Sequence, residues 1–157
     1  MNFINKKRIT MCLIIVLALT NLYQFNKLHN YKELIESNDY KFKLSLKIIS
    51  NSIESLELKR FDDFACLAHL SSSVGQSYAI YDATSYYNEN KLLSRVLWDL
   101  NNNISNKNNI KEVLDENDLT VLIPALKKLE ENPQDSEATE ELSYLVKKYT
   151  VIGSTLP

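Results

Sequence analysis

The sequence has few residues that form turns. Only two of its 157 residues are glycine and three are proline. Hairpins and β-sandwiches need a turn every several residues, and glycine and proline are the strongest turn formers. Their scarcity argues against a fold of short strands and predicts an all-α protein.

Cysteine and histidine are also scarce, with two of each. Cys12 lies in an apolar segment, so Cys66 is the only thiol of the remaining chain and no intramolecular disulfide is expected there. Cys66 and His69 are three residues apart, the spacing of side chains that share a helix face. Such a couple is a nucleophile pair or half of a metal site, but the second pair of ligands that a structural zinc ion needs is missing. We expect a buried Cys66, a surface His69, no metal and no cofactor.

Motifs of catalytic chemistry are missing as well. The sequence has no glycine-rich phosphate loop, no GxSxG elbow and no HExxH helix. The acidic segment 115–118 lacks the central glycine of a calcium-binding loop, so it is interpreted as a solvated surface. These absences predict a protein that is not an enzyme.

A long apolar run occupies the N-terminal part of the chain. Residues 9–22 are almost entirely apolar, and three basic residues precede them: Lys6, Lys7 and Arg8. This order is typical of a single membrane anchor or of a secretory signal peptide. Residues 23–25 extend the run to the lower edge of the length that spans a bilayer, about 17 residues. The residues assigned to lipid contact are Ile9, Leu13, Ile14, Ile15, Val16, Leu17, Leu19 and Leu22.

The choice between anchor and signal peptide depends on a cleavage site. The best small-x-small candidate is segment 18–20, in which Thr20 is a poor residue at the scissile position. We therefore prefer an uncleaved transmembrane anchor over residues 9–25, and cleavage after about Thr20 is the alternative. Basic residues before a span keep the N-terminus cytoplasmic. The predicted location is the cell membrane, single-pass, with residues 1–8 cytoplasmic and the C-terminal part outside.

Helical periodicity follows the anchor without a break. Residues 26–152 are predicted to form an extracytoplasmic domain of four or five helices, most simply an antiparallel bundle, and residues 153–157 a C-terminal tail. In residues 31–58 one stripe is expected to face the core, and it comprises Leu34, Asn38, Phe42, Ser45, Ile49, Ile53 and Leu56. Because no glycine or proline separates this stretch from the anchor, one continuous helix is predicted.

The region 62–87 carries two stripes. Small residues repeat at helical spacing and are predicted to let a second helix approach closely: Ala65, Ala68, Ser72, Gly75, Ala79 and Ala83. A bulky stripe beside them is predicted to fill the next groove between helices, and it comprises Leu67, Leu70, Val74, Tyr78 and Tyr81. Further helices are predicted at 92–104, at 110–114, at 119–131 with a kink at Pro124, and from Asp135 or Ser136 to Tyr149. Trp98 is interpreted as a core residue, and a position near the membrane surface is the alternative.

Charge narrows the choice of partner. Residues 31–157 contain 14 basic and 20 acidic residues, a net charge of −6. A negative domain repels the phosphate backbone, so no nucleic-acid partner is expected.

The tyrosines are the remaining candidates for a recognition surface. Tyr78, Tyr81, Tyr86 and Tyr87 cluster within ten residues, and tyrosine suits both interfaces and ordinary packing at a core boundary. The leading hypothesis is a membrane-anchored helical protein that contacts lipid through its N-terminal helix and binds or regulates another protein at the membrane surface. The alternatives are a sensor-like module with a tyrosine-lined ligand pocket and a cleaved, secreted effector.

Overall fold

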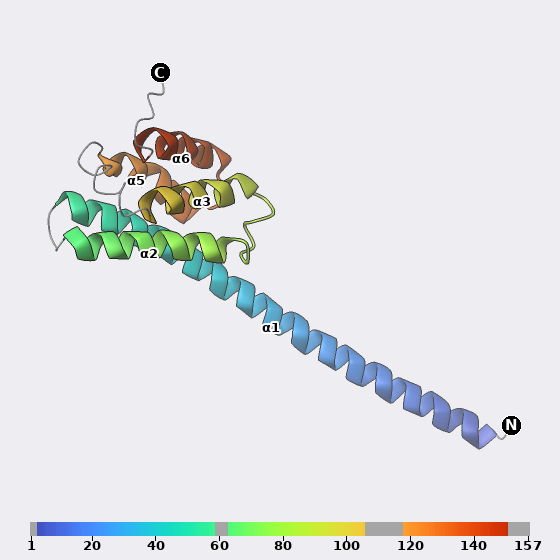
Figure 1. Cartoon of the computed structure of the whole chain (residues 1–157). Coiled ribbons are helices and arrows are strands. Elements are labelled where there is room, and N and C mark those ends of the chain that lie inside the picture. The colour runs from blue at the N-terminus through green and yellow to red at the C-terminus, as the bar shows by residue number, and fades with distance from the viewer. Residues whose placement is uncertain (1–2, 59–62, 106–117, 151–157) are drawn as a thin grey trace. The chain divides into compact units, whose positions relative to one another are not determined.

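Every regular element of the structure is a helix. The computed structural model describes residues 3–58, 63–105 and 118–150, and no strand occurs in these ranges. The helices are α1 (Phe3–Glu57), α2 (Asp63–Tyr81), α3 (Lys91–Ser105), the 3₁₀ helix η1 (Leu119–Leu122), α5 (Ile123–Glu131) and α6 (Ser136–Tyr149) (Figure 1). The all-α prediction is confirmed, whereas the helix expected at 110–114 and the tail at 153–157 lie outside the described residues.

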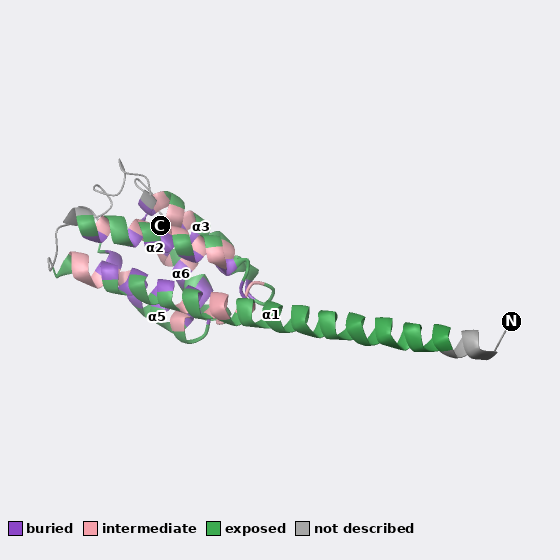
Figure 2. Ribbon diagram, turned by 90° about the horizontal axis from the view of Figure 1, so that it is seen from below, coloured by how far each residue is buried: buried purple, intermediate pink, exposed green. Residues whose placement is uncertain are grey.

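The chain divides into two units, Met1–Glu36 and Ser37–Pro157. In the first unit, every α1 side chain from Arg8 to Leu34 is exposed (Figure 2). α1 also contains an 18-residue window of mean hydropathy 1.6, none of it buried. By length and composition this helix is a candidate membrane span, although a signal sequence has the same properties. The prediction that one helix continues from the apolar run into the next segment is confirmed.

The second unit has one apolar core. The last part of α1 contributes a stripe in which Phe42, Leu46 and Ile49 are 0% exposed and Ile53 is 2% exposed. Side chains of α2, α3, η1, α5 and α6 complete the same cluster. The predicted α1 stripe is therefore correct from Asn38 onward. It is wrong at Leu34, which belongs to the first unit and is 55% exposed.

α2 buries its predicted bulky stripe, but not the small stripe beside it. Leu70, Val74 and Tyr81 are fully buried, whereas the small residues are exposed except for half-buried Gly75. A Cβ atom on Gly75 would meet the Asn101 side chain of α3 at 3.4 Å. Most of the small stripe is therefore exposed, and Gly75 is the member that lies close to the Asn101 side chain. Apolar transfer explains the orientation, because burying Leu and Val gains more than burying Ala.

Pro124 marks a helix start. Segment 119–131 divides into η1 and α5, and Pro124 occupies the first turn of α5, where its missing N–H group costs nothing. The predicted mid-helix kink is therefore wrong. Aspartates cap η1 and α6: Asp118 accepts the Thr120 N–H at 2.8 Å, and Asp135 accepts the Ala138 N–H at 2.9 Å.

Candidate functional site

Tyr81 is a core residue. Its side chain is 0% exposed, its ring lies 4.9 Å from the Phe42 ring, and its hydroxyl donates to the Asn90 carbonyl at 2.7 Å. Burial, followed by the charge of Asp82, raises the pKa of Tyr81 far above its usual range. A partner cannot reach this side chain without opening the core, so Tyr81 stabilises the fold.

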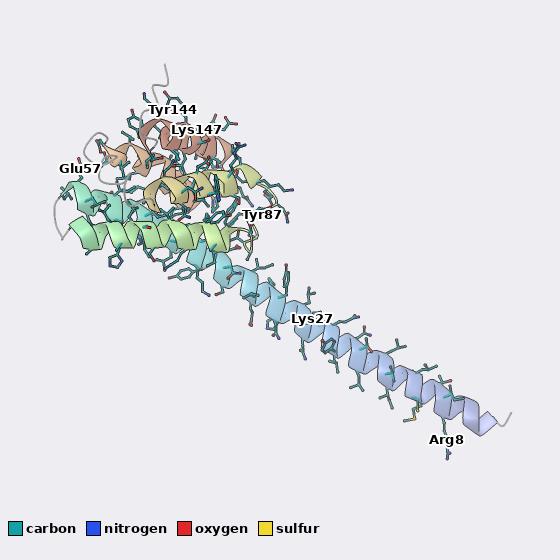
Figure 3. The ribbon with its side chains drawn as sticks, viewed as in Figure 1. Arg8, Lys27, Glu57, Tyr87, Tyr144 and Lys147 are labelled. Atoms are coloured by element: carbon teal, nitrogen blue, oxygen red, sulfur yellow. The ribbon has the colours of Figure 1, made fainter. Side chains whose placement is uncertain are left out.

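The other three predicted tyrosines lie at the edge of the core. Tyr78, Tyr86 and Tyr87 are half-buried and pack against the buried cluster (Figure 3 labels Tyr87). The Lys43 ammonium lies 5.8 Å from the centre of the Tyr86 ring. Burial, and then the charge of Asp39, raises the pKa of Tyr86. A role for these three residues in partner binding stays a prediction.

Hydrogen bonds hold the segment between α2 and α3 in place. The Asn90 amide donates to the Pro133 carbonyl at 2.9 Å and to the Thr139 hydroxyl at 2.7 Å. On the other side, the Asp39 carboxylate accepts from the Ser85 N–H at 2.8 Å and from its hydroxyl at 2.7 Å. The polar side chains around the tyrosine cluster are thus engaged in structural contacts.

A surface hollow lies between α1 and α2. Its volume is about 270 Å³, and its lining consists of Ile48, Asn51, Ser52, Ser55, Ala65, Cys66 and His69. The buried Cys66 and exposed His69 agree with the sequence prediction, and both contribute to this lining. The lining offers a thiol, an imidazole, two hydroxyls and an amide, and contains no carboxylate or tyrosine. Among the described residues, no group of three His, Cys, Asp or Glu side chains is placed to hold a metal ion.

An exposed apolar stripe on α1 leads to this hollow. Tyr40, Leu44 and Ile48 are 68%, 41% and 36% exposed and follow one another at four-residue steps, so they share one helix face. Ile48 also belongs to the hollow. Sequence reasoning missed this stripe, although its spacing is visible beside the stripe of Phe42, which faces the core.

Trp98 does not lie in the core. It is 48% exposed, because Val96, Leu97 and Leu100 occupy the buried face of α3. The expectation of a core tryptophan is therefore wrong. Tyr144 of α6 is likewise exposed, at 52% (Figure 3).

The predicted lipid-contacting residues surround α1 on all sides. Their exposed fractions run from 49% at Ile15 to 62% at Leu17 and Leu19. Arg8 is exposed at the start of this stretch (Figure 3), and Lys6 and Lys7 belong to the same helix.

Comparisons with protein-family models, with curated proteins and with solved structures found no match to this chain.

Proposed function

We propose that this chain is a single-pass membrane protein whose second unit binds or regulates another protein outside the cytoplasm, without enzymatic activity. The observation that carries the proposal is the continuity of α1. One helix, Phe3–Glu57, includes both the exposed apolar window and the stripe that enters the core of the second unit. The apolar window and the first helical segment of the second unit therefore belong to one helix.

A bilayer accounts for the exposed window. Apolar side chains on every side of a helix gain about 25 cal/mol per Å² when they leave water, and no protein surface covers these side chains in the described residues. Lys6, Lys7 and Arg8 precede the window and would keep the N-terminus cytoplasmic. The second unit would then lie outside.

The contacts between helices support a largely antiparallel bundle in the second unit. In two helix pairs, the residue numbers of successive contacts rise on one helix and fall on the other, as they do between antiparallel helices. These contacts are Asn38 with Ala83 and Ser45 with Ser77 for α1 and α2, and Gly75 with Asn101 and Ser94 with Asp82 for α2 and α3. Between α3 and α6 they rise together, from Asn90 with Thr139 to Asn103 with Thr150. We therefore propose a bundle with one parallel pair.

The surface proposed to bind the partner is the stripe of Tyr40, Leu44 and Ile48 together with the adjoining hollow. Contiguous exposed apolar side chains beside a concavity are typical of protein interfaces, where aromatic residues contribute most of the binding energy. The polar groups of the hollow, including Asn51 and His69, would give the interface hydrogen-bonding specificity.

A photo-reactive amino acid at Leu44 tests the proposal. The full-length chain is expressed in its native membranes and illuminated, and a discrete adduct with a different protein is expected. The control carries the same group at exposed Glu137 on α6 and should give no such adduct. Equal products from both positions, or monomer alone from Leu44, would contradict the proposed surface.

The two alternatives predict other results. A small-molecule ligand of a tyrosine-lined pocket would raise the melting temperature of the full-length protein, and the substitution Tyr78→Ala would abolish that rise. A secreted effector would appear in the medium with the mass of a chain cleaved after about Thr20.

A further inference from the structure

Two amide side chains interrupt the apolar window of α1. Asn21 and Gln24 are exposed, and neither has a hydrogen-bond partner among the described residues. Thr20 differs, because its hydroxyl donates to the Val16 carbonyl at 2.8 Å within the same helix. The two amides therefore keep their full capacity to donate and accept hydrogen bonds.

The proposed span places both amides inside the hydrocarbon layer. With residues 9–25 as the span, Leu17 lies at its midpoint. At 1.5 Å per residue, Asn21 lies about 6 Å and Gln24 about 10 Å from that midpoint, within the half-thickness of about 15 Å. No water is available there, so an unpaired amide is costly and favours association with another polar group.

The amides belong to a seam with alternating steps of three and four residues. Its members are Ile14, Leu17, Asn21, Gln24, Leu28, Tyr31 and Ile35. This is the spacing at which two helices pack side by side in a left-handed coiled coil. The seam continues beyond the apolar window, where Leu28 and Tyr31 are 68% and 61% exposed.

The acidic residues next to the seam, and His29, lie on other faces of the helix. His29 is 3.3 Å from Glu33, and Lys32 is 3.6 Å from Glu36. In the repeat that puts Leu28 at its first position, these four residues occupy positions two, five and six. His29, Glu33 and Glu36, at positions two and six, point away from a partner on the seam. Lys32, at position five, and Lys27, at position seven, flank the seam and face each other between the two copies of a parallel pair. Their long side chains can keep the ammonium groups in water.

We infer that α1 pairs in parallel with α1 of a second copy of this chain along this seam. A second copy is the partner that polar complementarity favours. A carboxamide carries both a donor and an acceptor, so the amides of two copies related by a two-fold axis can hydrogen-bond to each other. A single Asn at the first position of the repeat, as Asn21 is, specifies both register and pairing. The inference rests on the proposed function, since it needs the anchor to stay in the membrane.

Cysteine cross-linking of the full-length chain tests the seam. Leu28→Cys and Asn26→Cys are each made in a Cys12→Ser background and reconstituted in phosphatidylcholine–phosphatidylglycerol vesicles. Position 28 lies on the seam and position 26 on the opposite face, so mild oxidation should give a disulfide-linked dimer with Leu28→Cys and little with Asn26→Cys. The Cys12→Ser chain alone measures any contribution of Cys66, which is buried.

A second measurement tests the amide itself. Energy transfer between labelled full-length chains, followed as lipid is added, reports the dimer dissociation constant. Asn21→Leu should raise that constant about 3- to 30-fold. The matched change Asn26→Leu, off the seam, should leave it unaltered.

Three outcomes are distinguishable. Unequal cross-linking together with a weaker dimer in Asn21→Leu supports the pairing. The pairing is overturned, and the anchor left intact, if the full-length protein resists alkaline extraction from the vesicles but fails either test of pairing. It fails if cross-linking is equal at positions 26 and 28, or if Asn21→Leu leaves the dimer dissociation constant unchanged. Protein recovered from its native cells in a shortened, soluble form overturns the anchor and the pairing together.

Discussion

At the scale of single residues, Asn90 connects three parts of the second unit. It precedes α3, its amide donates to the Pro133 carbonyl and the Thr139 hydroxyl, and its carbonyl accepts from the Tyr81 hydroxyl. The side chain is 5% exposed. Buried polar groups cost free energy unless each is paired, so this small network depends on all of its members.

Removal of the amide should therefore destabilise the fold. In Asn90→Ala, the Pro133 carbonyl loses its amide donor in a buried position, and we expect the free energy of unfolding to fall by about 2–3 kcal/mol. Thermal or urea unfolding of the full-length chain in detergent measures the change. Asn88→Ala, at a nearby exposed position, is the matched control and should stay within about 0.5 kcal/mol of the parent. A loss equal to that of the control would contradict the structural role.

Tyr81 makes stability depend on alkaline pH. Its pKa is raised in the folded state by burial and then by the charge of Asp82, whereas in the unfolded chain it titrates near its ordinary value of about 10. Above that pH the unfolded state has released a proton that the folded state retains. The free energy of unfolding should therefore fall as pH rises beyond about 10, with a contribution of up to about 1.4 kcal/mol per pH unit.

The variant Tyr81→Phe isolates this contribution. Other tyrosines and lysines titrate in the same range in both proteins, so the difference between the two pH profiles reports Tyr81 alone. Tyr81→Phe lacks the hydrogen bond to Asn90, so its free energy of unfolding should be lower than that of the parent. This difference should be largest below pH 10 and should shrink above it. Parallel profiles would show that Tyr81 has an ordinary pKa.

At the scale of elements, α1 carries two apolar stripes with different environments. Phe42 and Ile49 face the core at 0% exposure, and Leu44 and Ile48 on a neighbouring face are 41% and 36% exposed. The first stripe is required for folding. The second has no structural requirement among the described residues, which is why we propose it as a binding surface.

Two alanine substitutions separate these roles. Phe42→Ala should lower the free energy of unfolding by about 3–5 kcal/mol, because it leaves a cavity in a packed core. Leu44→Ala, two residues away, should change it by less than about 0.5 kcal/mol while weakening the adduct formed by a photo-reactive group at Tyr40. Equal destabilisation by the two variants would show that the second stripe also supports the fold.

Periodicity predicted the elements better than it predicted their faces. The helices, their caps and the continuity of α1 follow from local patterns such as Asp135 before α6. The faces of α2 and α3 depend on which neighbours compete for the core. The small residues of α2 were placed incorrectly because several faces of that helix are apolar enough to be buried. Trp98 was placed incorrectly because α3 has one apolar face, formed by residues such as Leu93, Leu97 and Leu100, and Trp98 lies outside it. The hollow beside Cys66 joins residues from two helices, and spacing along one helix indicated only the pairing of Cys66 with His69.

At the scale of the whole molecule, charge is distributed unevenly along the chain. Lys6, Lys7 and Arg8 precede the apolar window, and residues 31–157 carry a net charge of −6. Under the positive-inside rule, the basic residues near the span determine its orientation, and acidic residues contribute little. The proposed topology therefore depends on three side chains.

Their replacement should disturb the orientation. In the triple variant Lys6→Gln, Lys7→Gln and Arg8→Gln, only Lys27 and Lys32 remain as basic residues close to the window, and they lie on its C-terminal side. We expect a substantial fraction of the chains to insert with the second unit in the cytoplasm. Protease added to intact cells measures this fraction, since it digests the second unit only when that unit is outside.

Glutamine at Lys27 and Lys32, the two nearby basic positions on the C-terminal side of the window, is the informative control. The double variant Lys27→Gln and Lys32→Gln removes the competing charges, so it should leave the second unit fully accessible to protease. It changes two flanking residues, against three in the triple variant. If orientation followed only the size of the domain to be exported, both variants would behave like the parent. Protection in the triple variant alone would show that the basic cluster orients α1. Full digestion in the triple variant would remove the basis for assigning the cytoplasmic side from Lys6, Lys7 and Arg8.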